Sequence, residues 1–190
     1  MDKARIYFSL RSPYSRLGLH IVQRNALPAT LIAFTGPPDG AAFQDPTMNK
    51  PKLAYYGLDA PRMTMRMGLT IARPSPFDVD FTPAIRAFYA ADARDRGLDF
   101  AIAASDARWG RGENVSDMAV LEACAKDIGL DPSIVADAQN DPAVDKALEA
   151  GRAAIEEDQA FGVPFAVFRA SKYWGHDRFD LLVEDMAAAR

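Results

Sequence analysis

The fold of this chain is decided by residues 4–34, which read ARIYFSLRSPYSRLGLHIVQRNALPATLIAF. The segment Ala4 to Leu10 is rich in residues that favour a pleated backbone and is followed by turn formers, so it predicts a buried strand. Ser12 before Pro13 is typical of a helix N-cap and first helical position, and apolar residues then recur at helical spacing as far as Asn25. Ala29 to Phe34 predicts a second buried strand. The chain therefore opens with a β-α-β unit.

The middle of the chain, from about Asp45 to Asp158, carries helix caps and 3.6-residue periodicity but no strand pattern, so we expect it to be all-helical. One helix is expected to start at Thr82-Pro83 and stop at Gly97, and the next to be capped by Ser116. Pro61 falls inside another helix and predicts a kink or a split there.

Strand signals return after Gly162 and predict a hairpin, with one strand in Val163–Phe168 and the other in Lys172–Trp174. A terminal helix follows from His176 or Asp177. This order predicts an α/β, thioredoxin-like fold with a large all-helical insertion. The thioredoxin-like domain takes residues 1–40 and 159–190, and the insertion takes residues 41–158.

The composition argues against several classes of function. The 190 residues carry 22 basic and 26 acidic side chains and a net charge of -4, without the basic stripe that binds nucleic acid. No apolar run is long enough to span a membrane, and no signal peptide is recognisable at the start, so we expect a cytoplasmic protein. The one cysteine, Cys124, excludes an internal disulfide, and with two histidines we expect no metal site. Cys124 lies on an apolar helical stripe and is expected to be inert.

Four motifs occur in a set order: Phe8-Ser9-Leu10-Arg11-Ser12-Pro13-Tyr14-Ser15, then Arg108-Trp109-Gly110-Arg111-Gly112, then Gly162-Val163-Pro164, then Trp174-Gly175-His176-Asp177-Arg178. Their order and spacing resemble those of the 2-hydroxychromene-2-carboxylate isomerases and kappa-class glutathione transferases. The resemblance covers nearly the whole chain and implies a glutathione cofactor and a homodimer.

In this family the start of the first helix stabilises the thiolate of glutathione, since free amides and the helix dipole favour an anion there. Ser12 occupies that place and is the catalytic candidate; the alternative is that it only caps its helix. Pro164 resembles the family's proline that follows a cis peptide bond, with the Val163 backbone turned outward to pair with glutathione. The alternative is a trans proline starting an edge strand.

The resemblance places the γ-glutamyl end of glutathione at His176 and Asp177, whose carboxylate would pair with the amine. The alternatives are an exposed histidine and an ordinary Asp N-cap. Arg178 reaches across the dimer in the family, or is a solvated first-turn residue. Lys52 matches the family's lysine that reaches the glycyl carboxylate of glutathione; the alternative is an ordinary surface lysine. Asn49 is matched to the family's glutathione-contacting asparagine, although its spacing to Lys52 is too short for that match.

Three residues are candidates for binding substrate. Arg11, beside Ser12, would attract a carboxylate or stabilise a thiolate, while Tyr89 and Trp109 would cover an apolar substrate. The alternatives are an exposed loop arginine and two core aromatics. Ser9, Leu10 and Arg16 depart from the family's usual residues, which leaves the substrate open.

The function implied by the resemblance is a glutathione-dependent cis–trans isomerase of the 2-hydroxychromene-2-carboxylate type, acting on an aromatic carboxylate in aromatic-compound degradation. Two alternatives stay open: a kappa-class-like glutathione transferase or peroxidase, and a non-catalytic glutathione-binding thioredoxin-like module. A dithiol oxidoreductase is disfavoured because a second cysteine is absent.

Overall fold

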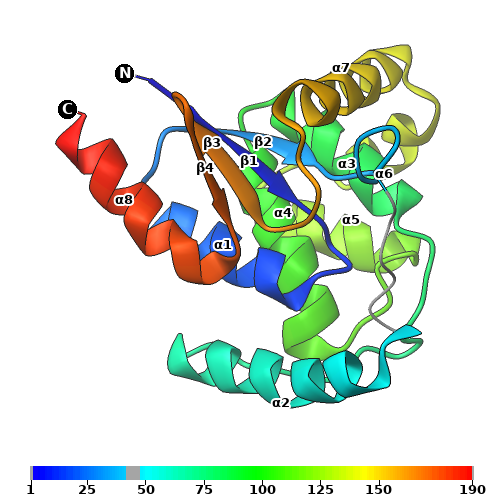
Figure 1. Cartoon of the computed structure of the whole chain (residues 1–190). Coiled ribbons are helices and arrows are strands. Elements are labelled where there is room, and N and C mark those ends of the chain that lie inside the picture. The colour runs from blue at the N-terminus through cyan, green and yellow to red at the C-terminus, as the bar shows by residue number, and fades with distance from the viewer. Residues whose placement is uncertain (1, 42–47, 190) are drawn as a thin grey trace.

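The computed structural model describes residues 2–41 and 48–189. Its four-stranded mixed sheet has the order β2-β1-β3-β4 and is covered by helices (Figure 1). The strands are β1 (Ala4–Phe8), β2 (Ala29–Ala33), β3 (Phe165–Phe168) and β4 (Ser171–Trp174). β1 pairs in parallel with β2 and antiparallel with β3, and β3 and β4 form the predicted hairpin.

The helices occupy the predicted parts of the chain. They are α1 (Pro13–Arg24), α2 (Lys50–Arg66), α3 (Thr82–Asp92), α4 (Gly97–Ser105), α5 (Met118–Asp127), α6 (Ser133–Asp137), α7 (Pro142–Asp158) and α8 (Phe179–Ala188). A π-helical turn over Asp106–Arg111 continues α4, and 3₁₀ turns cover Ala138–Asn140 and His176–Arg178. No strand lies in residues 48–158, so the thioredoxin-like α/β fold with a helical insertion is confirmed. The first residues of the expected helical block, 45–47, lie outside the described chain.

Alternating side chains of the strands build two cores. Ile6 and Phe8 of β1 face the larger core, which includes residues of α1, α3, α4 and α8. Tyr7 points to the opposite face, where it packs with Ile32 of β2 and Ile155 of α7. Successive strand residues point to opposite sides of a sheet, so a short strand such as β1 is buried on both faces.

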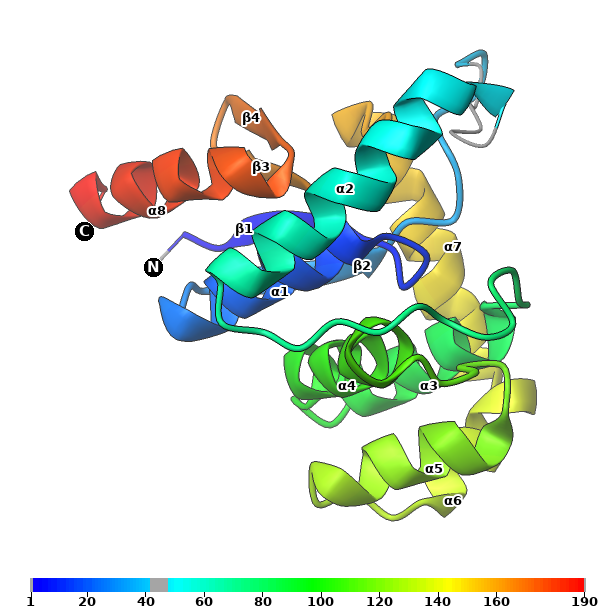
Figure 2. The same ribbon diagram turned by 90° about the horizontal axis from the view of Figure 1, so that it is seen from below.

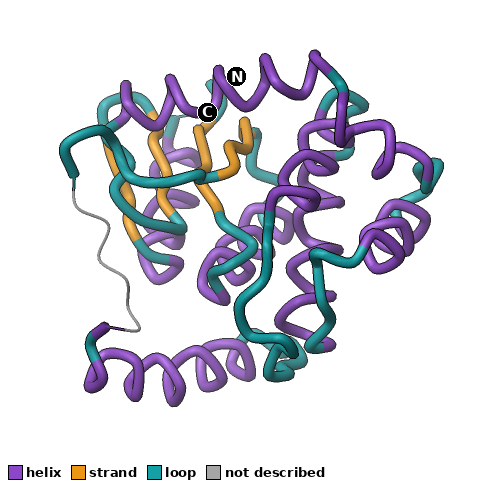
Figure 3. The backbone as a smooth tube through the Cα atoms, turned by 90° about the vertical axis from the view of Figure 1, so that its right-hand side faces the viewer, coloured by secondary structure: helices purple, strands orange, loops and turns teal. Residues whose placement is uncertain are grey.

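Helix α2 lies at the edge of the molecule, beside α1 and apart from α5 and α6 (Figures 2 and 3). The predicted split at Pro61 does not occur, since α2 runs as one helix from Lys50 to Arg66. The missing N–H of proline leaves the carbonyl four residues earlier, that of Gly57, without its helical partner. Gly57 is exposed, so this carbonyl can bond to water instead.

Two other boundaries differ from the predictions. Gly97 does not stop a helix: α3 ends at Asp92, and Gly97 is the first residue of α4. Ser116 does not cap α5, because Asp117 takes that position and accepts a hydrogen bond from the Ala119 N–H at 2.9 Å. In the part of the chain that is described, no helix has the length and apolarity needed to cross a membrane.

Candidate functional site

The start of α1 is the centre of the predicted site. Ser12 caps the helix, and its hydroxyl accepts a hydrogen bond from the Ser15 N–H at 3.2 Å. Ser12 is thus the N-cap of α1, and capping leaves its hydroxyl hydrogen free to donate elsewhere. Pro13 has no N–H, and no described residue accepts from the N–H of Tyr14. The first turn therefore offers two donors, the Ser12 hydroxyl and the Tyr14 amide, to an anion.

The Val163–Pro164 peptide bond is cis, as the resemblance implies. Pro164 is buried against α1 at Gly18, where a Cβ atom would lie 3.2 Å from the Pro164 Cβ and 3.0 Å from a ring carbon of Phe179. The carbonyl of Pro164 accepts from the Gly175 N–H at 2.9 Å. The Val163 backbone forms no turn or loop hydrogen bond within the described chain, so it remains able to pair with an extended peptide.

His176 is buried, so the expectation of an exposed histidine is wrong. Its ring stacks on that of Tyr14, with centroids 5.2 Å apart, and its Nε2 has no partner among the described residues. Burial lowers the pKa of His176, against the pull of three nearby carboxylates. The imidazole is therefore neutral at pH 7, with a nitrogen that can donate to or accept from a bound ligand.

Tyr14 joins α1 to α2. Its hydroxyl donates to Asp59 Oδ2 at 2.9 Å, and its ring meets that of Tyr56 edge-on at 5.9 Å. Burial and the Asp59 carboxylate raise the pKa of Tyr14 far above its ordinary value. The phenol thus stays protonated, with its hydrogen directed at Asp59, and its role is to hold α2 against the start of α1.

Lys52 and Asn49 lie at the start of α2. The Lys52 ammonium lies 5.7 Å from the centroid of the Tyr56 ring, which itself contacts Tyr14. Asn49 is the N-cap of α2 and accepts from the Lys52 N–H at 3.0 Å. Through Tyr56, these contacts bring Lys52 near Tyr14. The side-chain oxygen of Asn49, in contrast, is already hydrogen-bonded within its own helix.

Asp177 and Arg178 lie in the 3₁₀ turn before α8. Asp177 does not cap α8, because residue 178 is the N-cap and forms no side-chain cap bond. The Asp177 carboxylate instead accepts from Arg178 Nη1 at 3.0 Å, and both side chains are exposed. Arg178 is a solvated first-turn residue of this chain taken alone, and Asp177 is accessible to a ligand amine.

Arg11 lies in the loop before Ser12, and Trp109 contacts that loop. The indole N–H of Trp109 donates to the Leu10 carbonyl at 2.9 Å, which ties the π-helical turn to the loop before α1. Arg11 lies over the ring of Phe81, 5.2 Å from its centroid, and its Nη1 is 3.3 Å from Asp78 Oδ1. These contacts place one cation and several aromatic rings next to the Ser12 turn.

Tyr89 and Cys124 lie elsewhere. Tyr89 is in the larger core, with its hydroxyl 2.4 Å from where a Cβ on Gly151 of α7 would lie. This position agrees with the alternative that Tyr89 is a core aromatic residue. Cys124 is fully buried on α5, and burial raises the pKa of its thiol to about 11. A thiol with that pKa is protonated at pH 7, as expected of an inert side chain.

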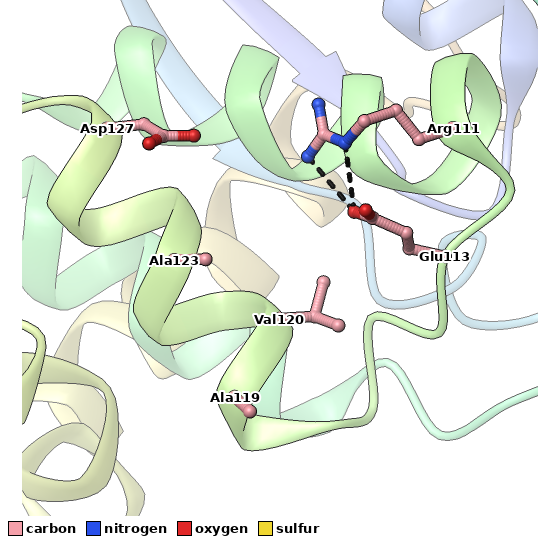
Figure 4. Close-up of a pocket in the computed structure, with 6 residues that line it drawn as sticks. All are labelled: Arg111, Glu113, Ala119, Val120, Ala123 and Asp127. Atoms are coloured by element: carbon pink, nitrogen blue, oxygen red, sulfur yellow. Dashed lines mark hydrogen bonds and ion pairs between the residues drawn. The ribbon is translucent and has the colours of Figure 1, made fainter.

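An open pocket of about 470 Å³ lies between the end of the π-helical turn and α5. It is lined by Arg111, Glu113, Ala119, Val120, Ala123 and Asp127 (Figure 4). Arg111 and Glu113 pair across its rim at 3.0 Å. None of the predicted site residues lines it, so we place the site at α1 on the strength of its donors and unpaired groups.

Comparison with known proteins fits this arrangement of a helix start, a cis-proline loop and a helical insertion. A family model for the DsbA-like thioredoxin domain matches residues 4–187. The chain belongs to this family. Among curated proteins, no sequence matches the chain.

Solved structures of DsbA-like proteins share the fold. A 2-hydroxychromene-2-carboxylate isomerase is 21% identical with a TM-score of 0.79, over 98% of this chain and 95% of that chain. A probable DsbA oxidoreductase from Streptomyces coelicolor is 17% identical with a TM-score of 0.78, over 100% and 90%. The cytosolic disulfide reductase DsbM from Pseudomonas aeruginosa, with GSH, is 14% identical with a TM-score of 0.68, over 98% and 96%.

Sequence reasoning about this DsbA-like chain missed three residues that assemble the site: Tyr14, Tyr56 and Asp59. Tyr14 was visible only as an apolar position two residues after Ser12. Its position between His176 and Asp59 depends on two segments that are distant in the sequence. The available signal was the spacing of Tyr56 and Asp59, three residues apart in the sequence, which puts both on one face of a helix.

Proposed function

We propose that this protein is a glutathione-dependent cis–trans isomerase of the 2-hydroxychromene-2-carboxylate type, acting on an aromatic carboxylate in aromatic-compound degradation. One observation carries the proposal. The helix start that would stabilise a thiolate holds Ser12, while the chain's one thiol, on Cys124, is buried on α5. A thiolate used at this site must therefore come from a bound thiol.

The residues around α1 fit glutathione. The Ser12 hydroxyl and the unpaired Tyr14 N–H would donate to the sulfur, and the unpaired Val163 backbone would pair with the tripeptide. Asp177, with the buried Nε2 of His176 nearby, would hold the γ-glutamyl end, and Lys52 would reach the glycyl carboxylate. Asn49 and Arg178 have weaker claims, because each already has a partner within its own segment.

Bound glutathione would supply a thiol that adds reversibly to a conjugated carbon, so that the carbon–carbon bond can rotate before the thiol leaves. The chain's own contribution is to lower the pKa of that thiol at the α1 start, through two hydrogen bonds and the helix dipole. Arg11, Phe81 and Trp109 would orient the substrate beside it. Tyr89 has no part in this arrangement because it is enclosed in the core.

Two proteins of the same fold support the proposal, since one is a 2-hydroxychromene-2-carboxylate isomerase and the other, the disulfide reductase DsbM, was determined with GSH. We further propose a cytoplasmic homodimer. Exposed apolar side chains on α2, including Leu58 and Met65, are available for such an interface, and light scattering on the purified protein would test it.

The test is conversion of 2-hydroxychromene-2-carboxylate, followed by ultraviolet absorbance, with and without glutathione. We expect conversion only with glutathione and no net consumption of the thiol. Conjugation of glutathione to an electrophile without isomerisation would instead establish a kappa-class-like transferase. Tight glutathione binding with neither reaction would establish a non-catalytic binding module, and absence of glutathione binding would refute the proposal.

A further inference from the structure

Among the described residues, two arginines, Arg16 and Arg108, are almost fully buried, and Arg16 forms a buried ion pair whereas Arg108 does not. Arg16 donates from Nε to Asp106 Oδ1 at 2.6 Å and from Nη1 to the Thr70 carbonyl at 2.7 Å. Arg108 is 1% exposed, and no carboxylate pairs with it in the described chain. Buried charges are normally paired, but the carboxylate whose charge acts on Arg108, that of Asp78, is exposed and forms no ion pair with it among the described residues.

The bonds of Arg108 explain how it is held. Its Nη1 donates to the Pro76 carbonyl at 2.7 Å, its Nη2 donates to the Phe77 carbonyl, and its Nε is buried without a partner. These carbonyls fix the loop that precedes α3. They satisfy hydrogen-bonding capacity but do not remove the charge.

The charge of Arg108 lies close to that of Arg11. The Arg108 guanidinium is 5.5 Å from the centroid of the Phe81 ring, and the Arg11 guanidinium is 5.2 Å from the centroid of the same ring. Arg108 also lies 5.9 Å from the ring centroid of Trp109. One buried and one exposed cation therefore both lie near the Phe81 ring. Of the two, Arg11 directly precedes the positive end of the α1 dipole.

Asp78 is the carboxylate nearest to this pair. It approaches Arg11 to 3.3 Å, and its side chain is 79% exposed. Ion pairs with this exposure contribute little to stability, so a ligand carboxylate can replace Asp78 at little cost. Phe77, which is half-exposed and meets Trp109 edge-on at 6.4 Å, offers apolar surface for a ring attached to that carboxylate.

We propose that Arg11, Phe77, Phe81 and Trp109 form a binding subsite for an aryl carboxylate, that Arg108 beneath it provides a second positive charge, and that Asp78 occupies the carboxylate position when no ligand is bound. The subsite deepens the proposed function and relies on it only for the reaction that follows binding. Arg108 does not touch the ligand. It acts by making the subsite prefer an anion over a neutral molecule of the same shape.

The test measures binding of cinnamate and of neutral cinnamamide to the full chain without glutathione, read from the indole N–H signal of Trp109 in nuclear magnetic resonance. Trp174 is the second tryptophan of the chain, and W174F assigns the signals. We expect D78N to bind cinnamate roughly two- to fivefold more tightly than the wild type, and R11Q to bind it roughly tenfold more weakly. Binding of cinnamamide should be weak and equal in all three.

A matched pair then separates the charge of Arg108 from its loop contacts. R108K keeps the charge and R108Q keeps a donor without the charge, so cinnamate affinity should fall only in R108Q. If R108Q fails to fold, Arg11 and Asp78 still decide, because both side chains are exposed. Cinnamate binding that is unchanged in R11Q and D78N, or cinnamamide binding as tight as that of cinnamate, would overturn the subsite. If the subsite is overturned but isomerisation is observed, the proposed function still stands. If cinnamate binds as expected but no isomerisation occurs, the subsite stands and the proposed function does not.

Discussion

Replacing Ser12 with alanine removes one of the two donors at the start of α1 and leaves the other. The hydroxyl currently accepts from the Ser15 N–H at 3.2 Å, so Ser12→Ala also removes a helix cap, at a cost of about 1 kcal/mol of stability. A hydrogen bond to a charged group contributes about 1.5–3 kcal/mol. Its loss should reduce glutathione-dependent turnover roughly ten- to a hundredfold and raise the pKa of the bound thiol by about one to two units.

The assay is a titration of bound glutathione, followed by the ultraviolet absorbance of its thiolate, together with the rate of isomerisation. Ser12→Gly is the matched control, because glycine retains most of the stability of an N-cap but has no hydroxyl. It should therefore match Ser12→Ala in thiol pKa and turnover while unfolding closer to the wild type. Ser12→Thr should restore both properties. If the thiol pKa and turnover stay at wild-type values in both the alanine and glycine variants, Ser12 is only a cap.

Three further predictions concern Gly18, Lys52 and Asp158. Gly18→Ala puts a Cβ 3.0 Å from Phe179 and 3.2 Å from Pro164 and should lower the free energy of unfolding by about 1–3 kcal/mol through overpacking. Gly57→Ala, which has open space around it, should be neutral or stabilising when both variants are unfolded in urea. Equal losses of stability in the two variants would argue against the packing explanation. Lys52→Ala should weaken glutathione binding roughly three- to tenfold and Lys50→Ala should not, as calorimetry would show; parallel behaviour would remove Lys52 from the site. Burial would raise the pKa of Asp158, but hydrogen bonds from Arg5 and Tyr7 hold it below its ordinary value. The stabilisation that Asp158 provides is therefore present above its unfolded pKa of about 3.9 and is lost as the pH falls through the lower folded value, so the gap in Tm between wild type and Asp158→Asn should close on acidification; a gap independent of pH would contradict this.

The strands and two of the helix caps were predictable because their signals are local. Ser12 and Asp141 each stand before a proline, and both cap the helix that begins there. Gly97 was misread for the same reason, since glycine after a helical pattern normally marks an end. Here the side chain of Asp92 lies against Gly97, so close that a Cβ would be 2.2 Å from its Oδ1, and the next helix begins at that point.

The candidate site was predictable only in part. The positions of Ser12 at a helix start and of Pro164 after a cis peptide bond were predictable because a short segment holds their geometry. The burial of His176 under Tyr14 and that of Arg108 over Phe81 depend on packing between distant segments. No local pattern distinguishes a buried arginine from an exposed one, because the side chain itself is the same and only the tertiary fold removes the water around it.

The position of β1 inside the sheet has a consequence for biosynthesis. β1 can pair with β2 as soon as α1 has formed, but its other edge is completed by β3, which begins at Phe165. Roughly 130 residues separate β2 from β3, so at about 5–20 residues per second of translation that edge stays open for about 7–26 seconds. Ile6 and Phe8 also lack the part of their core that β3, β4 and α8 contribute during this interval. The nascent chain therefore presents an unpaired apolar strand until β3 emerges, which makes ribosome-associated chaperones important for its yield and makes truncation before β3 a direct route to aggregation.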